Sequence, residues 1–351
     1  MTAETLLKKL IETKSLTAEE FTLLIQQRKS VANNAQAAAR ELQNRHYGNK
    51  IYMRGLIEVS NICKNGCKYC GIRCENDKII RYRLSMQDIL GCCRQGYDAG
   101  YRTFVLQGGE DPWFTDDRCV QLLLEIKRMY PDCAVTLSLG ERSHEGYKRF
   151  REAGADRYLL RFETANYEHY AYLHPTEMSF KNRLMCLDDL KNLGYALGTG
   201  FLVGAPGEKD SYWGEDMALL CRLKPDMVGI GPFLPHGDTP FRNSAAGSME
   251  LTLFILSLVR IMLPKVLLPA TTAVNTLENN GREQAVLHGA NVVMPNLSPP
   301  DVRDKYMLYD GKKNTGAEAL EGFRDMQSRM EKIGYQCVVS RGDPASSTVN
   351  N

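Results

Sequence analysis

Short apolar runs alternate with amphipathic stretches from residue 56 to residue 294. The runs have the length of buried strands, and the segments between them show helical spacing of apolar positions. Strand and helix recurring at roughly thirty-residue intervals are typical of parallel crossover units, and eight such units close a barrel. The pattern predicts an α/β fold, a (β/α)8 TIM-type barrel, with a six-strand partial barrel as the alternative. The eight expected strands lie at residues 56–60, 103–107, 134–139, 157–162, 196–203, 226–231, 266–270 and 291–294.

Both ends of the chain are expected to add helices to this barrel. Residues 4–13 have apolar positions at helical spacing, and Thr17 to Glu20 form a capping box that opens a second helix. We expect residues 1–50 to be an N-terminal helical cap over the barrel floor and residues 51–311 to be the barrel. Residues 312–351 form a C-terminal helical extension and a polar tail, disordered from Arg341 onward because that segment is rich in serine, asparagine and proline.

Composition narrows the function classes. The chain has 351 residues, enough for a large core, and 44 basic against 42 acidic residues give a net charge of +2. This balance argues against a nucleic-acid groove. No signal peptide is expected, and the most apolar run, Leu251 to Val259, is too short to cross a membrane. Eleven cysteines fit a reducing compartment, so we predict a cytoplasmic protein.

Three cysteines, Cys63, Cys67 and Cys70, lie within eight residues directly after the first strand. A structural zinc site takes four protein ligands, whereas a cubane iron-sulfur cluster on three cysteines leaves one iron open to a substrate or cofactor. Cys74 could complete a four-cysteine zinc knuckle, which is the alternative. The spacing, with Tyr69 just before the last cysteine, resembles the signature of the radical S-adenosylmethionine (SAM) superfamily. We therefore predict that the three cysteines hold a [4Fe-4S] cluster.

Further unusual residues follow the ends of other predicted strands, where active sites of such barrels are built. Glycines at 108 and 109 allow close approach to a ligand, although an ordinary turn would also use them. Resemblance to the superfamily implies that this loop binds the amino group of SAM, that Glu163 contacts its ribose or sulfonium, and that Arg183 binds its carboxylate. A structural ion pair between Glu163 and Arg183 is the alternative. The predicted SAM-binding residues are Tyr69, Gly108, Gly109, Glu110, Glu163 and Arg183.

A second polar group is expected inside the barrel, where branched apolar residues are usual. An arginine flanked by hydroxyls suits a ligand with a carboxylate, whereas buried threonines that bond their own backbone are the alternative. Tyr309, His236 and Asp238 lie on rim loops that could join this group. The predicted substrate-binding residues are Thr136, Ser138, Arg161, Thr271, Thr272 and Tyr306.

Five stretches closely resemble the HydE family, the radical SAM maturases of [FeFe]-hydrogenase. They are residues 106–112, 162–166, 231–236, 269–273 and 289–296. The resemblance implies one essential [4Fe-4S] cluster that reduces SAM to methionine and a 5′-deoxyadenosyl radical. It also implies a cysteine-bound iron carbonyl cyanide substrate supplied by the maturase HydG, with HydF as scaffold and a low-potential electron donor. Thr136, Arg161, Thr271, Thr272 and Tyr306 match the family's carboxylate-holding pocket.

Some family members bind an accessory cluster near the C-terminus, but residues 312–332 contain no cysteine, so we predict one cluster only. Two other functions are considered. A relative such as biotin synthase or methylornithine synthase would act on a small carboxylate, although biotin synthase would need cysteines inside the barrel and the predicted strands contain none. An iron-sulfur redox-sensing or binding module would leave Glu163 and Arg183 without a role.

Overall fold

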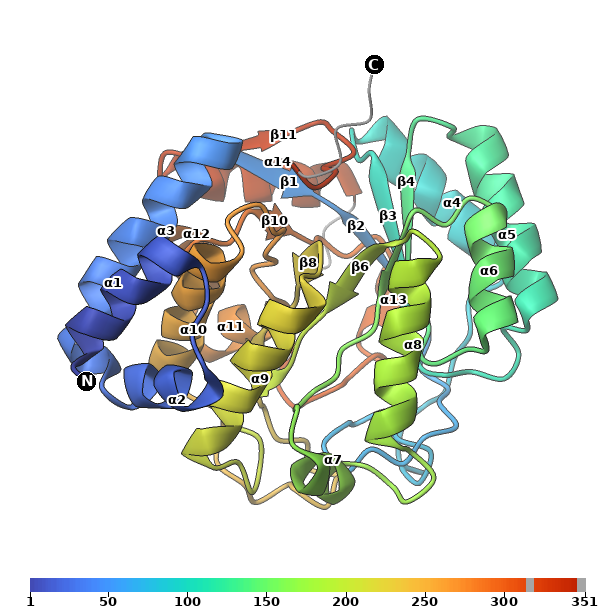
Figure 1. Cartoon of the computed structure of the whole chain (residues 1–351). Coiled ribbons are helices and arrows are strands. Elements are labelled where there is room, and N and C mark those ends of the chain that lie inside the picture. Colours follow the sequence, from blue (N-terminus) through green and yellow to red (C-terminus); the bar gives the residue numbers. More distant parts are fainter. Residues whose placement is uncertain (314–318, 346–351) are drawn as a thin grey trace.

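The computed structural model describes residues 1–313 and 319–345 (Figure 1). The strands are β1 (Lys50–Met53), β2 (Gly55–Ser60), β3 (Thr103–Gly108), β4 (Ala134–Ser138), β5 (Arg157–Leu159), β6 (Ala196–Thr199), β7 (Leu202–Val203), β8 (Met227–Val228), β9 (Gly231–Pro232), β10 (Val292–Val293) and β11 (Gln336–Val338). The helices are α1 (Ala3–Thr13), α2 (Ala18–Gln26), the 3-10 helix η1 (Arg28–Ser30), α3 (Ala32–Tyr47), α4 (Met86–Asp98), α5 (Asp116–Met129), α6 (His144–Glu152), α7 (Tyr167–Leu173), α8 (Phe180–Asn192), α9 (Asp210–Leu223), α10 (Met249–Met262), α11 (Thr272–Leu277), α12 (Gly281–Leu287), α13 (Pro300–Arg303) and α14 (Ala319–Glu331).

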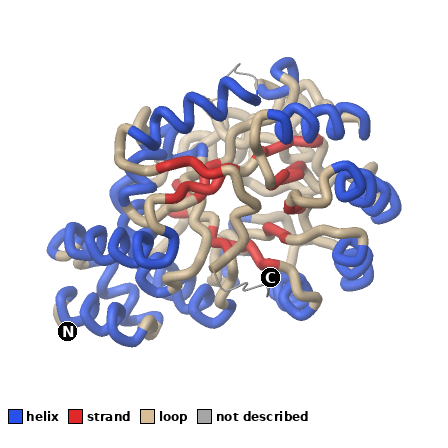
Figure 2. Tube along the Cα trace, turned by 90° about the horizontal axis from the view of Figure 1, so that it is seen from above, coloured by secondary structure: helices blue, strands red, loops and turns tan. Residues whose placement is uncertain are grey.

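Eight parallel segments close into a barrel, which confirms the predicted fold. β2, β3, β4, β5, β6 and β8 pair in that order. Residues 266–270 continue the ring through bridges from Leu267 to Met227 and from Pro269 to Val292. The ring closes where Leu56 pairs with Asn296. Seen from above, the strands lie inside a surround of helices (Figure 2).

Two of the predicted strands are interrupted where neighbouring backbones approach closely. Residues 196–203 form β6 and then β7, and residues 226–231 contain only β8 and the start of β9. At Gly200 the φ angle is +152°, and a Cβ there would lie 2.0 Å from the carbonyl oxygen of Gly229. Only glycine fits this approach, so the regular ladder breaks at this point of the barrel.

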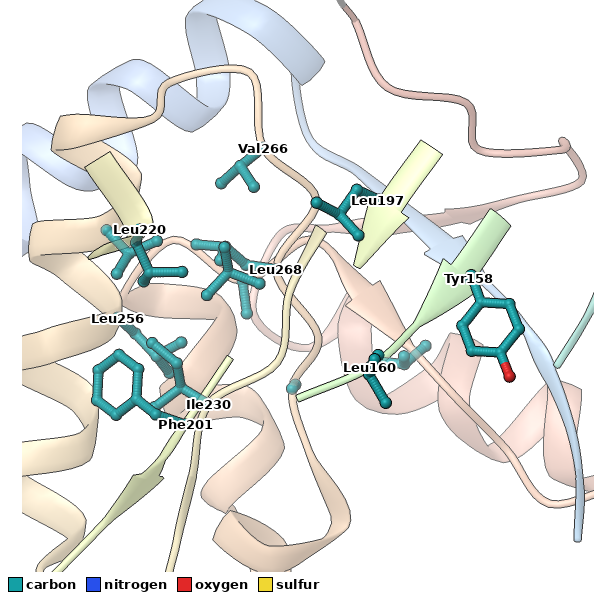
Figure 3. Packing of buried hydrophobic residues seen from close by; sticks show 14 of the residues in the cluster. Tyr158, Leu160, Leu197, Phe201, Leu220, Ile230, Leu256, Val266 and Leu268 are labelled. Carbon is teal, nitrogen blue, oxygen red and sulfur yellow. The ribbon is translucent and has the colours of Figure 1, made fainter. Parts of the chain in front are cut away.

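The core lies between the strands and the surrounding helices. β2 is buried along its whole length, as expected for a parallel strand covered on both faces. Figure 3 shows Phe201, Ile230 and Leu268 gathered beside Leu220 of α9 and Leu256 of α10, all within one buried cluster. This packing fixes the positions of the strand ends from which the rim loops emerge.

The N-terminal helices pack on the outer helices of the barrel. α2 lies against α9 and α3 against α10, and α2 begins with the predicted capping box at Thr17 and Glu20. α3 leads into β1, an additional strand that the apolar pattern did not predict. No helix among the described residues is long and apolar enough to span a membrane. The domain boundaries at residues 50 and 311 stay predictions.

The C-terminal segment covers the barrel floor. β11, which was not predicted, pairs with β1, and the buried Arg157 of β5 donates to the carbonyl oxygens of Arg341 (2.7 Å) and Gly342 (3.3 Å). Arg157 also contacts Asp343 at 2.6 Å. The expected disorder from Arg341 onward is therefore wrong for residues 341–345, because a buried guanidinium takes its acceptors from them. Residues 346–351 lie outside the described residues.

Replacing Arg157 with methionine should lower the free energy of unfolding by about 2–4 kcal/mol, because Asp343 and two backbone carbonyls lose a buried donor. Anaerobic urea unfolding measures this change. Arg149→Met is the matched control, because Arg149 pairs with Asp117, whose side chain is 84% exposed, and should leave stability nearly unchanged. Equal losses in the two variants would show that Arg157 does not hold the floor segment.

Candidate functional site

The loop after β2 brings the three predicted cluster cysteines to the rim, and a single arginine holds its shape. Arg81 donates to the carbonyl oxygens of Asn61 (2.6 Å), Ile72 (2.8 Å), Arg73 (2.6 Å) and Asn76 (2.9 Å). These acceptors come from both ends of the loop. The fixed fork of guanidinium donors therefore ties residues 61–76 into one conformation without a covalent link.

Cys63, Cys67 and Cys70 are half-buried and lie near one another. Burial raises the pKa of Cys70 to about 12. The pKa of Cys67 is also raised, first by burial and then by the neighbouring Cys70 and Cys63 thiolates. Three crowded, desolvated thiolates need cationic partners, and iron supplies that charge. The donor set therefore fits the predicted cluster.

Cys74 does not join the other three cysteines. Its side chain is exposed and its sulfur lies 3.1 Å from a carboxylate oxygen of Glu75. The surroundings of Cys74 favour the three-ligand assignment over the four-cysteine zinc knuckle.

The double glycine after β3 packs against the cluster loop. A Cβ at Gly109 would lie 2.2 Å from the carbonyl oxygen of Ile62 and 2.7 Å from the Cβ of Cys63. Glycine is thus required at 109 for close packing against the cluster loop. Glu110 pairs with Lys64 at 3.2 Å and accepts a hydrogen bond from the backbone of Glu141. The predicted SAM contacts of Gly108, Gly109 and Glu110 stay predictions.

Glu163 and Arg183 both lie at this rim, but they do not pair with each other. Arg183 is buried and donates to Glu141 at 2.6 Å and to the carbonyl oxygen of Arg161. Glu163 instead pairs with Arg161, because Nη2 of Arg161 lies 3.0 Å from the carboxylate oxygen Oε2 of Glu163. The alternative of a Glu163–Arg183 ion pair is therefore wrong, because the two residues have different partners.

The backbone at Glu163 is also unusual. Its φ angle is +67°, and only Lys14 and Lys224 share a positive φ among the described non-glycine residues. A left-handed conformation at a residue with a side chain is unfavourable and persists where the surroundings impose it, often at functional sites. The carboxylate of Glu163 lies near Cys67 of the cysteine loop, and its contact with SAM stays a prediction.

Tyr69 is surrounded by side chains of the next rim loops. Its hydroxyl lies 3.2 Å from Nε2 of His174, and its ring packs against a small cluster that includes Leu173, Ala205 and Phe233. The side chain is therefore a packing element of the loop. The predicted contact of Tyr69 with SAM is not tested by these distances.

The predicted substrate residues include polar atoms that are buried without partners. Thr136 of β4 is completely buried and its hydroxyl has no hydrogen-bond partner among the described residues. The same holds for the hydroxyl of Thr271 and for Nε of Arg161. The alternative that these threonines bond their own backbone is not observed. Buried polar groups are normally satisfied, so these three groups are available to a polar ligand.

The other predicted substrate residues occupy neighbouring positions. Ser138 ends β4 and is half-buried, and Thr272 begins α11. Tyr306 is buried, and its hydroxyl accepts a hydrogen bond from Gln107 of β3 at 3.4 Å. Burial raises the pKa of Tyr309 to about 12, and Thr276 contacts its hydroxyl. The structure thus adds Gln107 to the predicted group.

Sequence reasoning also missed a buried ion pair. Glu58 of β2 lies 2.5 Å from Lys312, and their side chains are 1% and 6% exposed. A charged residue in the middle of an apolar strand is the signal that could have marked Glu58. Nothing near Lys312 in the sequence indicates its partner.

Glu208, in the loop after β7, is a half-buried carboxylate without a predicted role. It accepts hydrogen bonds from the indole of Trp213 (2.6 Å) and the backbone of Gly204 (2.8 Å). Burial raises the pKa of Glu208 to about 7, although both hydrogen bonds oppose this. The loop therefore contains a group that titrates near neutrality.

Comparison with known proteins identifies close relatives. The model of the Radical SAM superfamily matches residues 57–220. The [FeFe] hydrogenase maturase subunit HydE of Thermotoga maritima is 46% identical over 274 residues, which cover 78% of each chain. The 3-methylornithine synthase of Methanosarcina barkeri is 31% identical over 337 residues, 93% of this chain and 92% of that one.

A solved structure shares the architecture over nearly its full length. The crystal structure of methylornithine synthase has a TM-score of 0.82 at 28% identity and covers 95% of this chain and 97% of that chain. The structure of HydG, at 19% identity, has a TM-score of 0.80 and covers 96% of this chain and 76% of that one. The HydG likeness concerns the fold alone.

Cys67→Ala should abolish the visible absorbance of the anaerobically reconstituted cluster, because two cysteines cannot hold it at three corners. Cys74→Ala is the matched control and should keep both iron content and absorbance. Loss of the cluster in the Cys74 variant would instead show that the fourth cysteine is a ligand.

Glu208→Gln should remove part of the pH dependence of stability. The folded pKa of about 7 lies above the ordinary value of 4.5. The stabilisation of the fold by protonated Glu208 is therefore complete below pH 4.5 and is lost as the pH rises through 7. The difference between wild type and variant should reach about 3 kcal/mol across this window. Anaerobic chemical unfolding followed by tryptophan fluorescence measures it, and parallel pH profiles would contradict the assignment.

Proposed function

This chain belongs to the HydE family of radical SAM enzymes, and we propose that it acts in assembly of the diiron centre of an [FeFe]-hydrogenase. Its cofactors are a [4Fe-4S] cluster and SAM. The observation that carries the proposal is the set of buried, unpartnered polar atoms of Thr136, Arg161 and Thr271, which belong to three different segments of the barrel wall. They lie in a chain whose relative named as a HydE maturase covers 78% of it.

The cofactor residues have separate tasks in this proposal. When bound, the [4Fe-4S] cluster supplies the electron that cleaves SAM to methionine and a 5′-deoxyadenosyl radical. Cys63, Cys67 and Cys70 hold the cluster. Glu163, whose carboxylate also pairs with Arg161, is proposed to contact the ribose or sulfonium of SAM. The cofactor contacts of Tyr69, Gly108, Gly109, Glu110 and Arg183 are proposed from the family.

Arg183 is proposed to bind the carboxylate of SAM through N–H groups of its guanidinium that do not contact Glu141 or Arg161. Those contacts fix the guanidinium plane beside the cluster loop. A buried and preoriented arginine loses little conformational entropy when it binds an anion. This placement supports the role without requiring a rearrangement of α8.

Arg161 is proposed to hold the carboxylate of the substrate. Its Nη2 donates to the carbonyl oxygen of Phe201 at 2.6 Å, which fixes the side chain, while Nε stays without a partner. The hydroxyls of Thr136 and Thr271 are available to the same ligand, and we assign Ser138, Thr272 and Tyr306 to the remaining wall. A cysteine-bound iron carbonyl cyanide species offers such a carboxylate.

A function like that of methylornithine synthase is the second candidate. The relative with this name aligns along 93% of the chain, more than the HydE relative does. Its higher coverage reflects the shared architecture, whereas the higher identity belongs to HydE. An iron-sulfur sensor is the third candidate and predicts no cleavage of SAM.

The proposed partners are HydG, HydF and a low-potential electron donor. We also propose a cytoplasmic location, which the eleven unpaired cysteines support. One cluster is proposed, since residues 312–332 contain no cysteine.

Under reducing, anaerobic conditions the reconstituted protein should release 5′-deoxyadenosine from SAM. With HydG, HydF and apo-hydrogenase, its addition should restore hydrogen evolution, and formation of 3-methylornithine should be absent. Methylornithine formation would instead establish the second candidate, and failure to cleave SAM would favour the sensor.

Arg161→Ala should lower maturation by about 100-fold, equivalent to about 3 kcal/mol, because a charge-assisted contact to the substrate is lost. SAM cleavage without substrate should also fall, because Arg161 lies beside Glu163, but the fall should be smaller than the loss of maturation. Arg149→Ala, on the exposed face of α6, is the control. Equal loss of both activities would place Arg161 at the SAM site or in folding.

A further inference from the structure

Residues 305–313 cross the rim of the barrel after α13, and we call them the strap. The carbonyl oxygen of Lys305 accepts from Nδ2 of Asn61 at 2.7 Å, and that of Leu308 accepts from the backbone of Gly71 at 2.8 Å. Further along, the backbone of Asp310 donates to the carbonyl oxygen of Pro235 at 3.0 Å. The strap therefore links the cluster loop to the loop after β9.

The strap ends in the buried pair of Lys312 and Glu58. Nζ of Lys312 donates to Oε1 of Glu58 at 2.5 Å and to the carbonyl oxygen of Tyr306 at 2.8 Å. It also lies 4.7 Å from the centroid of the Tyr306 ring. The second carboxylate oxygen of Glu58 accepts from Asn296 at 2.8 Å. One ammonium thus fixes the far end of the strap to β2 and contacts Tyr306 through both backbone and ring.

The strap carries two tyrosines into the barrel. Tyr306 is 2% exposed and reaches Gln107 of β3, and Tyr309 reaches Thr276 of α11. Neither contact can persist if the strap leaves the rim. The conformation of the strap therefore determines whether this side of the predicted substrate site exists.

The strap also touches the cluster loop directly. A Cβ at Gly71, the residue after Cys70, would lie 2.3 Å from the carbonyl oxygen of Met307. Together with the hydrogen bond from Gly71 to Leu308, this contact places the strap backbone against the end of the cysteine triplet. Strap position and cluster-loop position are therefore linked.

We propose that the strap is the closing element of the barrel mouth and that Lys312 and Glu58 are the positioning residues that latch it, setting Tyr306 against the substrate. The inference rests on the proposed function, because Tyr306 is assigned there to the wall of the substrate site. Entry of the substrate then requires the latch to separate, and closure restores the contacts of Tyr306 and Gly71.

Amide hydrogen exchange of the reconstituted protein with SAM bound tests the latch. Lys312→Met should make exchange in residues 305–313 about tenfold faster or more, because the opening free energy of this segment falls. The double variant Glu58→Gln/Lys312→Met removes both charges. It should regain the thermal midpoint lost in the single variant, since no unpaired charge stays buried, but should keep the fast exchange of the strap.

Arg329→Met is the matched control, because it breaks a pair with Glu283 (2.6 Å) between α14 and α12. The strap of the Arg329→Met variant should exchange as slowly as that of the wild type. Lys312→Arg keeps the positive charge, so its strap should exchange more slowly than that of Lys312→Met. Unchanged exchange in Lys312→Met, or slow exchange in the double variant, would overturn the latch. Loss of SAM cleavage in the wild type would sink the proposed function instead, and the exchange measurement does not depend on it.

Discussion

The burial of three thiols at one point of the rim is the constraint on which the rest of the structure depends. Burial and mutual repulsion raise the pKa of Cys67, so the thiolate form needs bound cations nearby. The charges of Arg81 and Arg183 lower the pKa values of the cysteines, but burial has the larger effect and raises them. The protein therefore prepares the shape of the site and leaves charge neutralisation to iron.

That shape requires close contact between segments far apart in sequence. Gly109 admits the carbonyl of Ile62, and Gly71 admits the carbonyl of Met307. A methyl group at either position would force the backbones apart. The loops after β2 and β3 and the strap thus form one packed unit around the cysteines, built on strand ends that the core holds in place.

The periodic apolar runs were sufficient to predict the barrel and the order of its eight segments, because burial on both faces leaves a continuous signal. β1 and β11 were missed because they are short and partly polar, and they form at the floor by pairing with each other. The order of residues 341–345 depends on Arg157, which lies almost two hundred residues earlier. The composition of residues 341–345 does not indicate that Arg157 is their partner.

The site was predictable to a similar extent. The cysteine spacing and the residues after strand ends are local signals, and these residues do gather at the rim and inside the barrel. Their pairings were not predictable: Arg183 selects Glu141 and Glu163 selects Arg161 because of loop conformation. The left-handed backbone at Glu163 is equally invisible in sequence, since nothing in its neighbours demands it.

The nature of the Lys312–Glu58 pair argues for reversible closure. Burying two charges costs desolvation free energy, and an apolar pair of similar size would often hold two elements together at least as well. An apolar latch, however, would expose hydrophobic surface whenever it opened. Charged groups regain their hydration when apart, so an ion pair narrows the free-energy difference between the closed and open strap. A permanent seal has no use for that property, whereas a mouth that must admit a substrate and then exclude water depends on it.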